Sequence, residues 1–499
     1  MSERTFHVLV IAALHAGADH STASAFSDPV RFERATFDEA MALVGPALTI
    51  EVPDPGAPRG NPAAPRGKPI DLELSFKAMR SFRPDALIEE VALLREHAAS
   101  HVPAPAKATS LVDDILAGMG PESARPAGAA VTLLSAIVHH PEVRRLEQAW
   151  RGLHFLVSRS DRNKVVVDAL HAHAEDVEAT LEQLAKRTDL EAFDLVVVDH
   201  TLGSSARDLA RIASWASLAE RMGVPLVTNG SPELVGENDL PMLGRTQRRL
   251  RASDDPRAAA VRSLAAQDAT RWIALAMNGA LARPRHAGAV KRTNGIELDE
   301  HGDLRMGAAH LVAVLACESF AKTGWACALT GPRPQHGVVR DLPVRSVDDR
   351  GTEVATPLEA LAAEETAAEA AAAGVILFAS AANQDVAVLT RASMLHRAAS
   401  TSGGTAAAAS LGLADQLFVA RVAQAVVQLA AAIPRDTPVA AATEVARLAL
   451  ADLFGEAASN RPAIDVTIAG APPSLEVTVR PRGFFDVRLE EASLAAPLA

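Results

Sequence analysis

The histidine pairs are the first place in this sequence where metal chemistry could reside. His139 and His140 are adjacent, whereas His171 and His173 are separated by one residue. Adjacent histidines on a helix point about 100° apart, and an i, i+2 pair on a strand shares a face but here lacks an evident carboxylate or third ligand. We therefore predict neither a metal site nor a bound cofactor.

Asp199 and His200 are the residues on which a catalytic site could be built, because they end or follow the apolar segment FDLVVVD. Enzymes with parallel sheets often place catalytic groups just after such a strand. Ser204 and Ser231 could supply a nucleophile, but neither lies in a G-x-S-x-G elbow. We predict no catalytic residues and no enzyme activity. An α/β enzyme that uses Asp199 and His200 is a rival hypothesis.

Two further motifs lack the residues that their chemistry needs. Gly403 and Gly404 have neither the Lys-Ser/Thr of a phosphate-binding loop nor the third glycine of a dinucleotide fingerprint, which predicts a plain loop. The basic run 245–251 either meets an acidic partner or forms a solvated helix face, and the sequence leaves both readings open.

The composition is that of a globular protein with more than one domain. The chain has 499 residues, 48% hydrophobic and 22% charged, so two or three domains are expected. A net charge of −12 argues against nucleic acid and anionic membranes as partners. The N-terminal apolar run is too short to insert into a membrane, so we predict a cytoplasmic protein. Cys317 and Cys327 are expected to be reduced core residues.

The first hundred residues predict a small β-α-β-β-α domain. A Pro/Gly-rich loop separates two strands that are expected to form a hairpin, and Pro84 opens the last helix. The expected elements are a strand at 5–14, a helix at 37–44, strands at 48–52 and 70–76, and a helix at 84–97. Residues 98–109 have no hydrophobic periodicity and indicate a linker.

The remainder predicts a large mixed α/β domain, so the fold class is α/β (α+β). A helix capped by Ser110 is followed by one broken at Pro141 and then by alternating strands and helices, which is typical of a parallel sheet. The expected strands are 165–170, 193–198, 224–228, 325–330 and 374–379, and the expected helices are 110–119, 131–157, 174–186, 209–222, 310–322, 358–373, 411–432 and 438–454.

The C-terminal residues predict a β ribbon. Its three strands are IDVTI, LEVTVRP and FDVRLEEA, and in the first two the apolar residues alternate with polar ones. The residues expected to define it are Ile464, Val466, Ile468, Leu475, Val477, Val479, Arg480 and Pro481. Such a ribbon is marginal alone. We expect it either to pair with residues 5–14 or to leave an edge open.

Two segments near the N-terminus resemble the small subunit of a type VI secretion contractile sheath, the TssB or VipA family. They are 27–55 and 70–97. The matching residues are Phe37, Asp38, Met41, Pro46, Val52, Pro53, Leu72, Phe76, Met79, Phe82 and Pro84.

The segment AIVHHPEVRRLEQAWRGLHFLVSRSD resembles the large sheath subunit, the TssC or VipB family. Its matching residues include His140, Pro141, Leu146, Glu147, Trp150, Arg151, Gly152 and Leu153. Weaker matches follow in the same order, among them the segment 319–344, which contains Pro343, and VTVRP. We expect Trp150 to be buried on a helix, and Leu74, Phe76 and Phe82 to be enclosed where the two parts meet.

The resemblance implies a single-chain fusion of the two subunits. The implied units are a small domain at 1–97, a linker at 98–109, a large domain at 110–460 and a strand-exchange ribbon at 461–499. The implied partners are further copies of the chain, an Hcp-like inner tube, baseplate proteins and a AAA+ recycling ATPase that would grip helix 110–119. The extra N-terminal strand usual in the small subunit is missing here. That absence favours an alternative: a non-polymerising paralogue that caps or regulates the apparatus.

Overall fold

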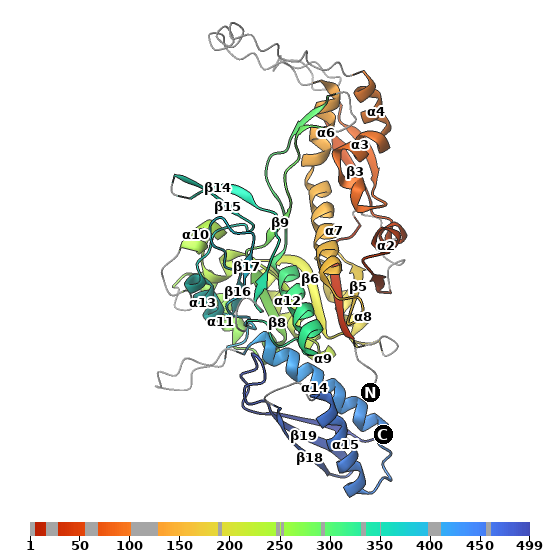
Figure 1. Cartoon of the computed structure of the whole chain (residues 1–499), viewed down its shortest axis with the longest axis vertical. Coiled ribbons are helices and arrows are strands. Elements are labelled where there is room, and N and C mark those ends of the chain that lie inside the picture. Colours follow the sequence, from red (N-terminus) through yellow and green to blue (C-terminus); the bar gives the residue numbers. More distant parts are fainter. Residues whose placement is uncertain are drawn as a thin grey trace.

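A seven-stranded sheet forms the centre of the molecule (Figure 1). The computed structural model describes residues 5–15, 28–54, 68–100, 128–187, 192–245, 250, 254–290, 295–330, 336–349, 351–397, 411–455 and 461–499. The strand order is β16-β8-β7-β6-β1-β5-β2, and every neighbouring pair is parallel except β5 with β2. The bounds are β1 Phe6–Ala12, β2 Val30–Phe32, β5 Val165–His171, β6 Leu195–Leu202, β7 Leu226–Gly230, β8 Ile273–Met277 and β16 Val375–Leu377.

Strand β1 lies inside this sheet, between β5 and β6. Side chains alternate between the two faces of a strand, so β1 contributes side chains to two hydrophobic cores. Val8 and Val10 belong to the core on one face, while Leu9 and Ile11 belong to the core on the other. All of β1 is buried, which is why it reads as a continuous apolar run rather than an alternating one.

Helices cover both faces of the sheet. Helix α12 (Ala308–Thr323) is buried nearly all round and belongs to the same core as α7 (Pro141–Arg159). The opposite face carries α8 (Val177–Leu184), α9 (Ala206–Met222), α11 (Pro256–Ala265) and α13 (Glu364–Ala373). The α/β class expected from the sequence is confirmed.

The residues after β2 pack against α7 and against α6 (Ala129–His139). Their elements are α2 Phe37–Val44, β3 Ala47–Val52, β4 Ile70–Ser75, the 3-10 helix η2 Met79–Phe82, α3 Pro84–Glu90 and α4 Ala92–Ala99. The hairpin is confirmed, with Ile50 opposite Leu72. The expected single helix is two helices, because Val91 has an extended backbone (φ −85°, ψ 111°).

An arm of paired strands runs along α7 toward α6 (Figure 1). It contains β9 Ala280–Arg283, β10 Ala287–Ala289, β11 Glu297–Asp299 and β12 Leu304–Met306, with β9 paired to β12 and β10 to β11. A second hairpin joins β14 (Arg345–Asp349) to β15 (Thr352–Thr356). Smaller elements are η3 Pro232–Val235, α10 Leu240–Arg245, η5 Asp268–Trp272, β13 Val338–Val339 and β17 Ala387–Val388.

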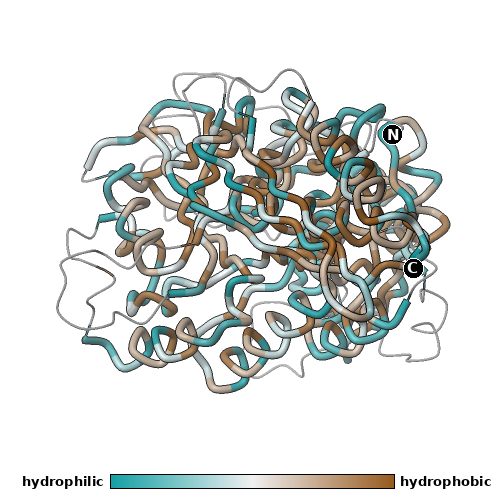
Figure 2. Tube along the Cα trace, turned by 90° about the horizontal axis from the view of Figure 1, so that it is seen from below, coloured by the Kyte–Doolittle hydropathy of each residue, from teal (hydrophilic) through white to brown (hydrophobic). Residues whose placement is uncertain are grey.

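The C-terminal residues form a separate three-stranded antiparallel sheet that packs on two helices. These elements are α14 Leu413–Ala432, α15 Val439–Leu453, β18 Ala463–Ala469, β19 Ser474–Arg480 and β20 Ala492–Pro497, and β19 is the middle strand. Seen from below, hydrophobic and hydrophilic residues alternate along the strands at this end of the molecule (Figure 2).

Three sequence-based assignments are wrong. Residues 325–330 form buried turns rather than a strand, since the Ser319 and Thr323 hydroxyls at the end of α12 bond to the Trp325 carbonyl at 2.6 and 2.8 Å. The expected helix 358–373 begins only at Glu364. Its first residues instead make strand-like bonds to the β9 region, including one from the Glu359 amide to the Gly279 carbonyl.

The third wrong assignment is the strand FDVRLEEA. There the Arg488 and Leu489 amides donate to Asp415, and Phe485 has a positive φ of 51°. These bonds hold the segment in turns. The third strand of the sheet is the alanine-rich β20, whose composition gives little strand signal.

Candidate assembly site

The segment with the most specific motif forms α7, which runs from the central sheet into the N-terminal elements. Pro141 occupies the first helical position, where its missing N–H costs nothing, and the His140 Nδ1 accepts the Glu142 amide at 3.3 Å. Apolar residues three and four apart then form a buried stripe. This stripe includes Val143, Leu146, Trp150, Leu153 and Val157.

Trp150 is fully buried on this helix, as expected. Its indole Nε1 donates to the Leu14 carbonyl at 3.0 Å, just beyond the end of β1. Its ring meets Phe32 and Phe37 edge to face, with centroids 5.8 and 6.1 Å apart. Trp150 therefore joins α7 to three different parts of the N-terminal segment.

Glu147 is a buried carboxylate in an ion network. It accepts from Arg283 of β9 at 2.7 and 2.9 Å and from Arg151 at 2.7 Å. Arg283 in turn contacts Glu300 at 2.5 and 3.0 Å, and Glu300 also contacts Arg144 at 2.7 Å. The network fastens the arm to α7.

Burial and ion pairing act in opposite directions on these groups. Burial would raise the pKa of Glu300, but bonds from Arg283 and the His286 amide lower it below its ordinary value. Burial would lower the pKa of Arg283, but Glu147 and Glu300 raise it. Burial and the neighbouring Arg283 lower the pKa of His286 to about 4. Glu300 and Arg283 are therefore ionised at neutral pH, while His286 is neutral.

Gly152 lets α7 approach α12. A Cβ at this position would lie 2.6 Å from the ring of His310. The imidazole of His310 is fully buried, with its Nδ1 3.7 Å from the Asp199 carboxylate. A side chain at position 152 would therefore force the buried His310 ring to shift.

Most apolar residues of the small-subunit motif belong to the same core as α6 and α7, whereas Asp38 and Pro53 are exposed. Phe76 and Phe82 stack with centroids 4.3 Å apart, and the Phe76 amide donates to the Pro46 carbonyl at 2.9 Å. Leu74, Phe76 and Phe82 are enclosed, as expected, and Pro84 is buried at the start of α3. Pro343 lies apart from both sets, half-buried in the loop before β14.

A second contact between the N-terminal segment and the central sheet lies on β1. His7 Nε2 is 2.7 Å from Asp168 of β5, and Arg31 of β2 donates to the same carboxylate at 3.0 Å. Burial would raise the pKa of Asp168, but His7 and Arg31 lower it. Three strands are thus joined through one buried acid.

The ribbon residues divide between a buried and an open strand. Leu475, Val477 and Val479 of β19 are buried in the main core, and Pro481 is buried just beyond them. Ile464, Val466 and Ile468 of β18 are only half-buried. Arg480 crosses the sheet, reaching Asp465 of β18 at 2.5 Å and Glu491 at 2.8 Å.

Of the two expected outcomes for the ribbon, pairing with residues 5–14 is wrong, because both edges of β1 are occupied by β5 and β6. The third strand is the chain's own β20. Within the described residues, no strand pairs with the second edge of β18, so that edge is open.

The residues considered for catalysis have separate partners. Asp199 accepts from the Asn229 amide group at 2.9 Å, whereas His200 Nε2 contacts the Ala172 carbonyl at 3.1 Å. Ser204 donates to Glu233 at 3.1 Å, and the buried Ser231 hydroxyl has no hydrogen-bond partner among the described atoms. Among these described residues, no serine is hydrogen-bonded to a histidine.

The histidine pairs also have structural partners. His139 Nδ1 contacts the Ser135 carbonyl at 2.7 Å and its Nε2 accepts the His301 amide at 2.7 Å. No group of three or more His, Cys, Asp or Glu in the described part of the chain is arranged to hold a metal ion. The glycine pair 403–404, helix 110–119 and most of the linker lie outside the described residues. None of the helices that the structure describes has the length and apolarity needed to cross a bilayer.

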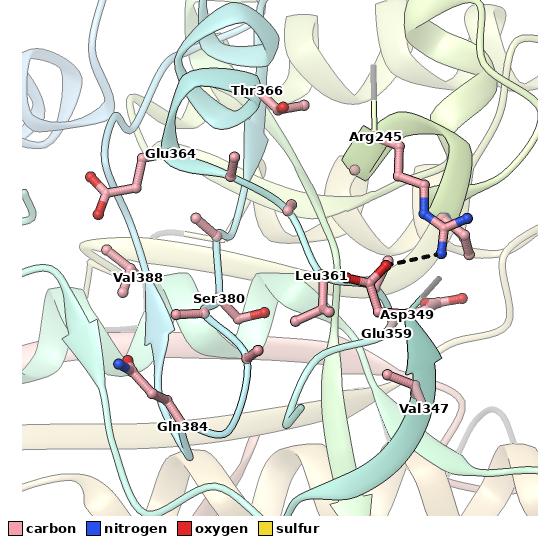
Figure 3. Close-up of a pocket in the computed structure, with 18 of the residues that line it drawn as sticks. Arg245, Val347, Asp349, Glu359, Leu361, Glu364, Thr366, Ser380, Gln384 and Val388 are labelled. Atoms are coloured by element: carbon pink, nitrogen blue, oxygen red, sulfur yellow. Dashed lines mark hydrogen bonds and ion pairs between the residues drawn. The ribbon is translucent and has the colours of Figure 1, made fainter. Parts of the chain in front are cut away.

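A cavity of about 950 Å³ opens beside the β14–β15 hairpin (Figure 3). It is lined by α10, β14 and the segments 359–364 and 379–384. Arg245, the first residue of the basic run, lies on its wall and contacts Asp349 at 3.3 Å, so the start of this run has an acidic partner within the chain. Sequence reasoning gave no sign of this cavity.

Comparison with known families accounts for this arrangement. The family described as EvpB/VC_A0108, tail sheath N-terminal domain (VipB) matches residues 129–396, more than half of the chain. The chain belongs to this tail sheath family. The type VI secretion system VipA family matches residues 1–99, so the chain is a fused TssB/TssC-like sheath protein.

The chain is also similar in sequence to an individual sheath protein. The type VI secretion system sheath protein TssC1 of Pseudomonas aeruginosa is 24% identical over 294 residues, which cover 53% of this chain and 59% of the relative. The chain thus matches less than two thirds of that relative's length. The VipA-like segment therefore supplies β1, an interior strand of a sheet whose other strands are mostly VipB-like.

Sequence reasoning missed the partners of the motif residues. Arg283, Glu300 and His310 hold Glu147 and Gly152 in place, yet they lie over 130 residues away. A signal was available at Arg283, where a charge ends the apolar run ALA. A charge in such a position points to a buried partner.

Proposed function

We propose that this chain is the repeating unit of a contractile type VI secretion sheath, which polymerises in the cytoplasm around an Hcp-like tube and drives effector injection by contracting. The open edge of β18 is the observation that carries the proposal. An unpaired edge offers a row of N–H and C=O groups to which another copy can add a strand. Such a joint keeps its hydrogen bonds while the subunits rotate.

The fusion suits this role. The linker keeps the two halves at an effective concentration of roughly millimolar or more, and it fixes their ratio at one to one. Because β1 is hydrogen-bonded on both sides, the VipA-like segment is a permanent part of the unit. In this proposal, contraction uses free energy stored at assembly, and recycling and attachment fall to a AAA+ ATPase and to baseplate proteins.

Negative-stain microscopy of the purified full-length chain tests polymerisation. Tubules of uniform diameter are the expected result. A monodisperse monomer under all salt and concentration conditions, also in the presence of an Hcp-like tube, would contradict the proposal.

Two proline variants on β18 test whether its edge makes the joint. Neighbouring residues on an edge strand alternate, so one of the Val466 and Thr467 N–H groups points to β19 and the other points outward. Proline at the outward position should abolish tubules with the fold intact, because that N–H is needed only for the added strand. Proline at the other position should destabilise the C-terminal sheet. If both variants fold and both form tubules, the joint lies elsewhere.

One observation favours a second candidate, the non-polymerising paralogue that caps or regulates the apparatus. The third strand of the C-terminal sheet is β20 from the same chain, so a neighbour is not needed to complete a three-stranded sheet. This candidate predicts a monomer that binds the end of a tube or sheath. Light scattering of the full-length chain distinguishes the two.

A further inference from the structure

Four histidines gather where the strand order of the central sheet reverses. The chain places β5 on one side of β1 and β6 on the other, so the carboxyl ends of these strands border the switch point. His171 ends β5, His15 follows β1, His173 follows β5 and His200 lies near the end of β6. The ring centroids of His171 and His173 are 4.8 Å apart, and those of His15 and His171 are 6.1 Å apart.

His171 makes an unusual pair of bonds there. Its Nδ1 accepts the Leu14 amide at 3.0 Å and the His15 amide at 3.2 Å. A ring nitrogen can accept only through its lone pair, so Nδ1 carries no proton while these bonds hold. The Leu14 carbonyl accepts the Trp150 indole, so the residues after β1 are held from two directions.

We infer that His171 is an acid-sensitive latch between the VipA-like and VipB-like parts of the chain: a proton at its Nδ1 removes the acceptor and releases residues 13–15 from the end of β5. The latch is closed when the ring is neutral. It ties the strand supplied by the first part to the sheet supplied by the second.

The surrounding charges set the direction in which the latch works. Burial, followed by His173, His15 and His200, lowers the pKa of His171 to about 4, and only the Ala12 carbonyl opposes this. The other groups facing the cluster are Asp199 and Arg211, which raise and lower the pKa of His200 respectively. Acidification therefore adds like charges to one cluster, and the latch opens as the pH falls.

The open and closed forms of the latch differ in the protons they bind, and this difference sets the direction of the pH effect. The released imidazole has an ordinary pKa of about 6.5, so the open form binds a proton that the closed form does not. Between about pH 6.5 and pH 4, the opening equilibrium should increase about tenfold per pH unit. It should then level off near the pKa of the closed form.

Amide hydrogen exchange of the full-length chain, expressed as protection factors, measures this opening. The His15 amide is the sharper reporter, because the Leu14 amide also donates to the Ala12 carbonyl at 2.9 Å. Its protection should fall about tenfold per pH unit from pH 6.5 to 4. Amides in the middle of β1 should stay protected over the same range.

Two matched variants assign the effect to one ring. In His171→Asn the Oδ1 can replace Nδ1 as acceptor but does not titrate there, so protection of the His15 amide should become flat with pH. His173→Asn removes a neighbouring charge and leaves the acceptor. In this variant the protection of the His15 amide should still fall as the pH decreases, but it should level off at a higher pH. An unchanged slope in His171→Asn would overturn the inference.

Nitrogen NMR of the His171 ring in the unmodified chain covers the case in which His171→Asn fails to fold. The expected result is an unprotonated Nδ1 at pH 7 that gains its proton as the His15 amide loses protection. A ring that is protonated while that amide stays protected would show that the bonds do not form a latch.

Discussion

At the scale of single residues, the motif around Trp150 acts through packing and hydrogen bonds. Trp150, Glu147 and Gly152 lie on one helix, but each contacts a different element: the end of β1, the arm and α12. The Trp150 contact therefore joins the two halves of the sheath unit, and the other two contacts hold α7 against the rest of the VipB-like half. Substitutions there should change the stability of the chain, and assembly only as a consequence.

Replacing Trp150 by alanine should lower the free energy of unfolding by about 3 to 5 kcal/mol, because a fully buried ring leaves a cavity. Trp150→Phe keeps most of the volume and loses the bond to the Leu14 carbonyl, so it should cost less than Trp150→Ala. Urea denaturation measures both. Equal losses in the two variants would mean that the hydrogen bond dominates over packing.

Gly152→Ala should destabilise the chain by about 1 to 3 kcal/mol, because the new methyl group meets the ring of His310. In a His310→Ala background the same change should be neutral or stabilising by up to about 1 kcal/mol, because alanine is the better helix former. Thermal unfolding of the four members of this double-mutant cycle gives the coupling. Additive effects would argue against the contact.

At the scale of elements, the arm depends on a buried ion network for its attachment to α7. Breaking such a network by removing one partner costs more than its formation contributes, because an unpaired charge remains buried. Glu147 and Glu300 keep Arg151 and Arg144 as partners when Arg283 is removed, which limits the loss. An exposed arginine on the same arm, Arg285, provides a control.

Arg283→Leu should therefore lower the free energy of unfolding by about 3 kcal/mol at pH 7, which is at the low end of the range for buried pairs. Arg285→Leu should lower it by less than about 1 kcal/mol. The depressed pKa of Glu300 means that its contribution is present above its unfolded pKa of about 4.3 and is lost as the pH falls below it. The deficit of Arg283→Leu should shrink in acid. Urea midpoints at pH 7 and at about pH 3 measure this, because the contribution is lost between the unfolded pKa and the lower folded pKa; a deficit independent of pH would contradict it.

At the scale of the whole molecule, the two family segments share one core and one sheet. Residues matched by the VipA family and residues matched by the VipB family contribute to the same hydrophobic cluster, and β1 is flanked on both sides by VipB-like strands. The packing of the shared core therefore holds the two halves together, and the covalent link between them mainly helps them to assemble.

Cleavage at a protease site engineered into residues 101–109 should leave the two pieces associated at micromolar concentration. The reason is that separating them would remove the interior strand β1 from the sheet and expose both cores. Size-exclusion chromatography of the cleaved chain, with a urea-separated sample as control, measures association. Two separate peaks under native conditions would disprove the shared core.

The sequence alone determined the elements whose pattern is local. Continuous apolar runs gave the buried strands, the alternation in residues 464–468 and 475–479 gave two C-terminal strands, and Pro141 gave the break between α6 and α7. These signals depend on neighbours within a few residues. The motif residues were likewise visible in the sequence.

Tertiary structure alone decided what those elements meet. The sequence could not place β1 between β5 and β6, because strand order depends on contacts more than 150 residues apart. It also misread 325–330, where the nearby Ser319 and Thr323 hydroxyls bond to the Trp325 carbonyl, and 485–491, where the distant Asp415 carboxylate accepts two backbone amides. The partners of Glu147, Gly152 and His171 follow from the same cause: long-range packing, which no local pattern encodes.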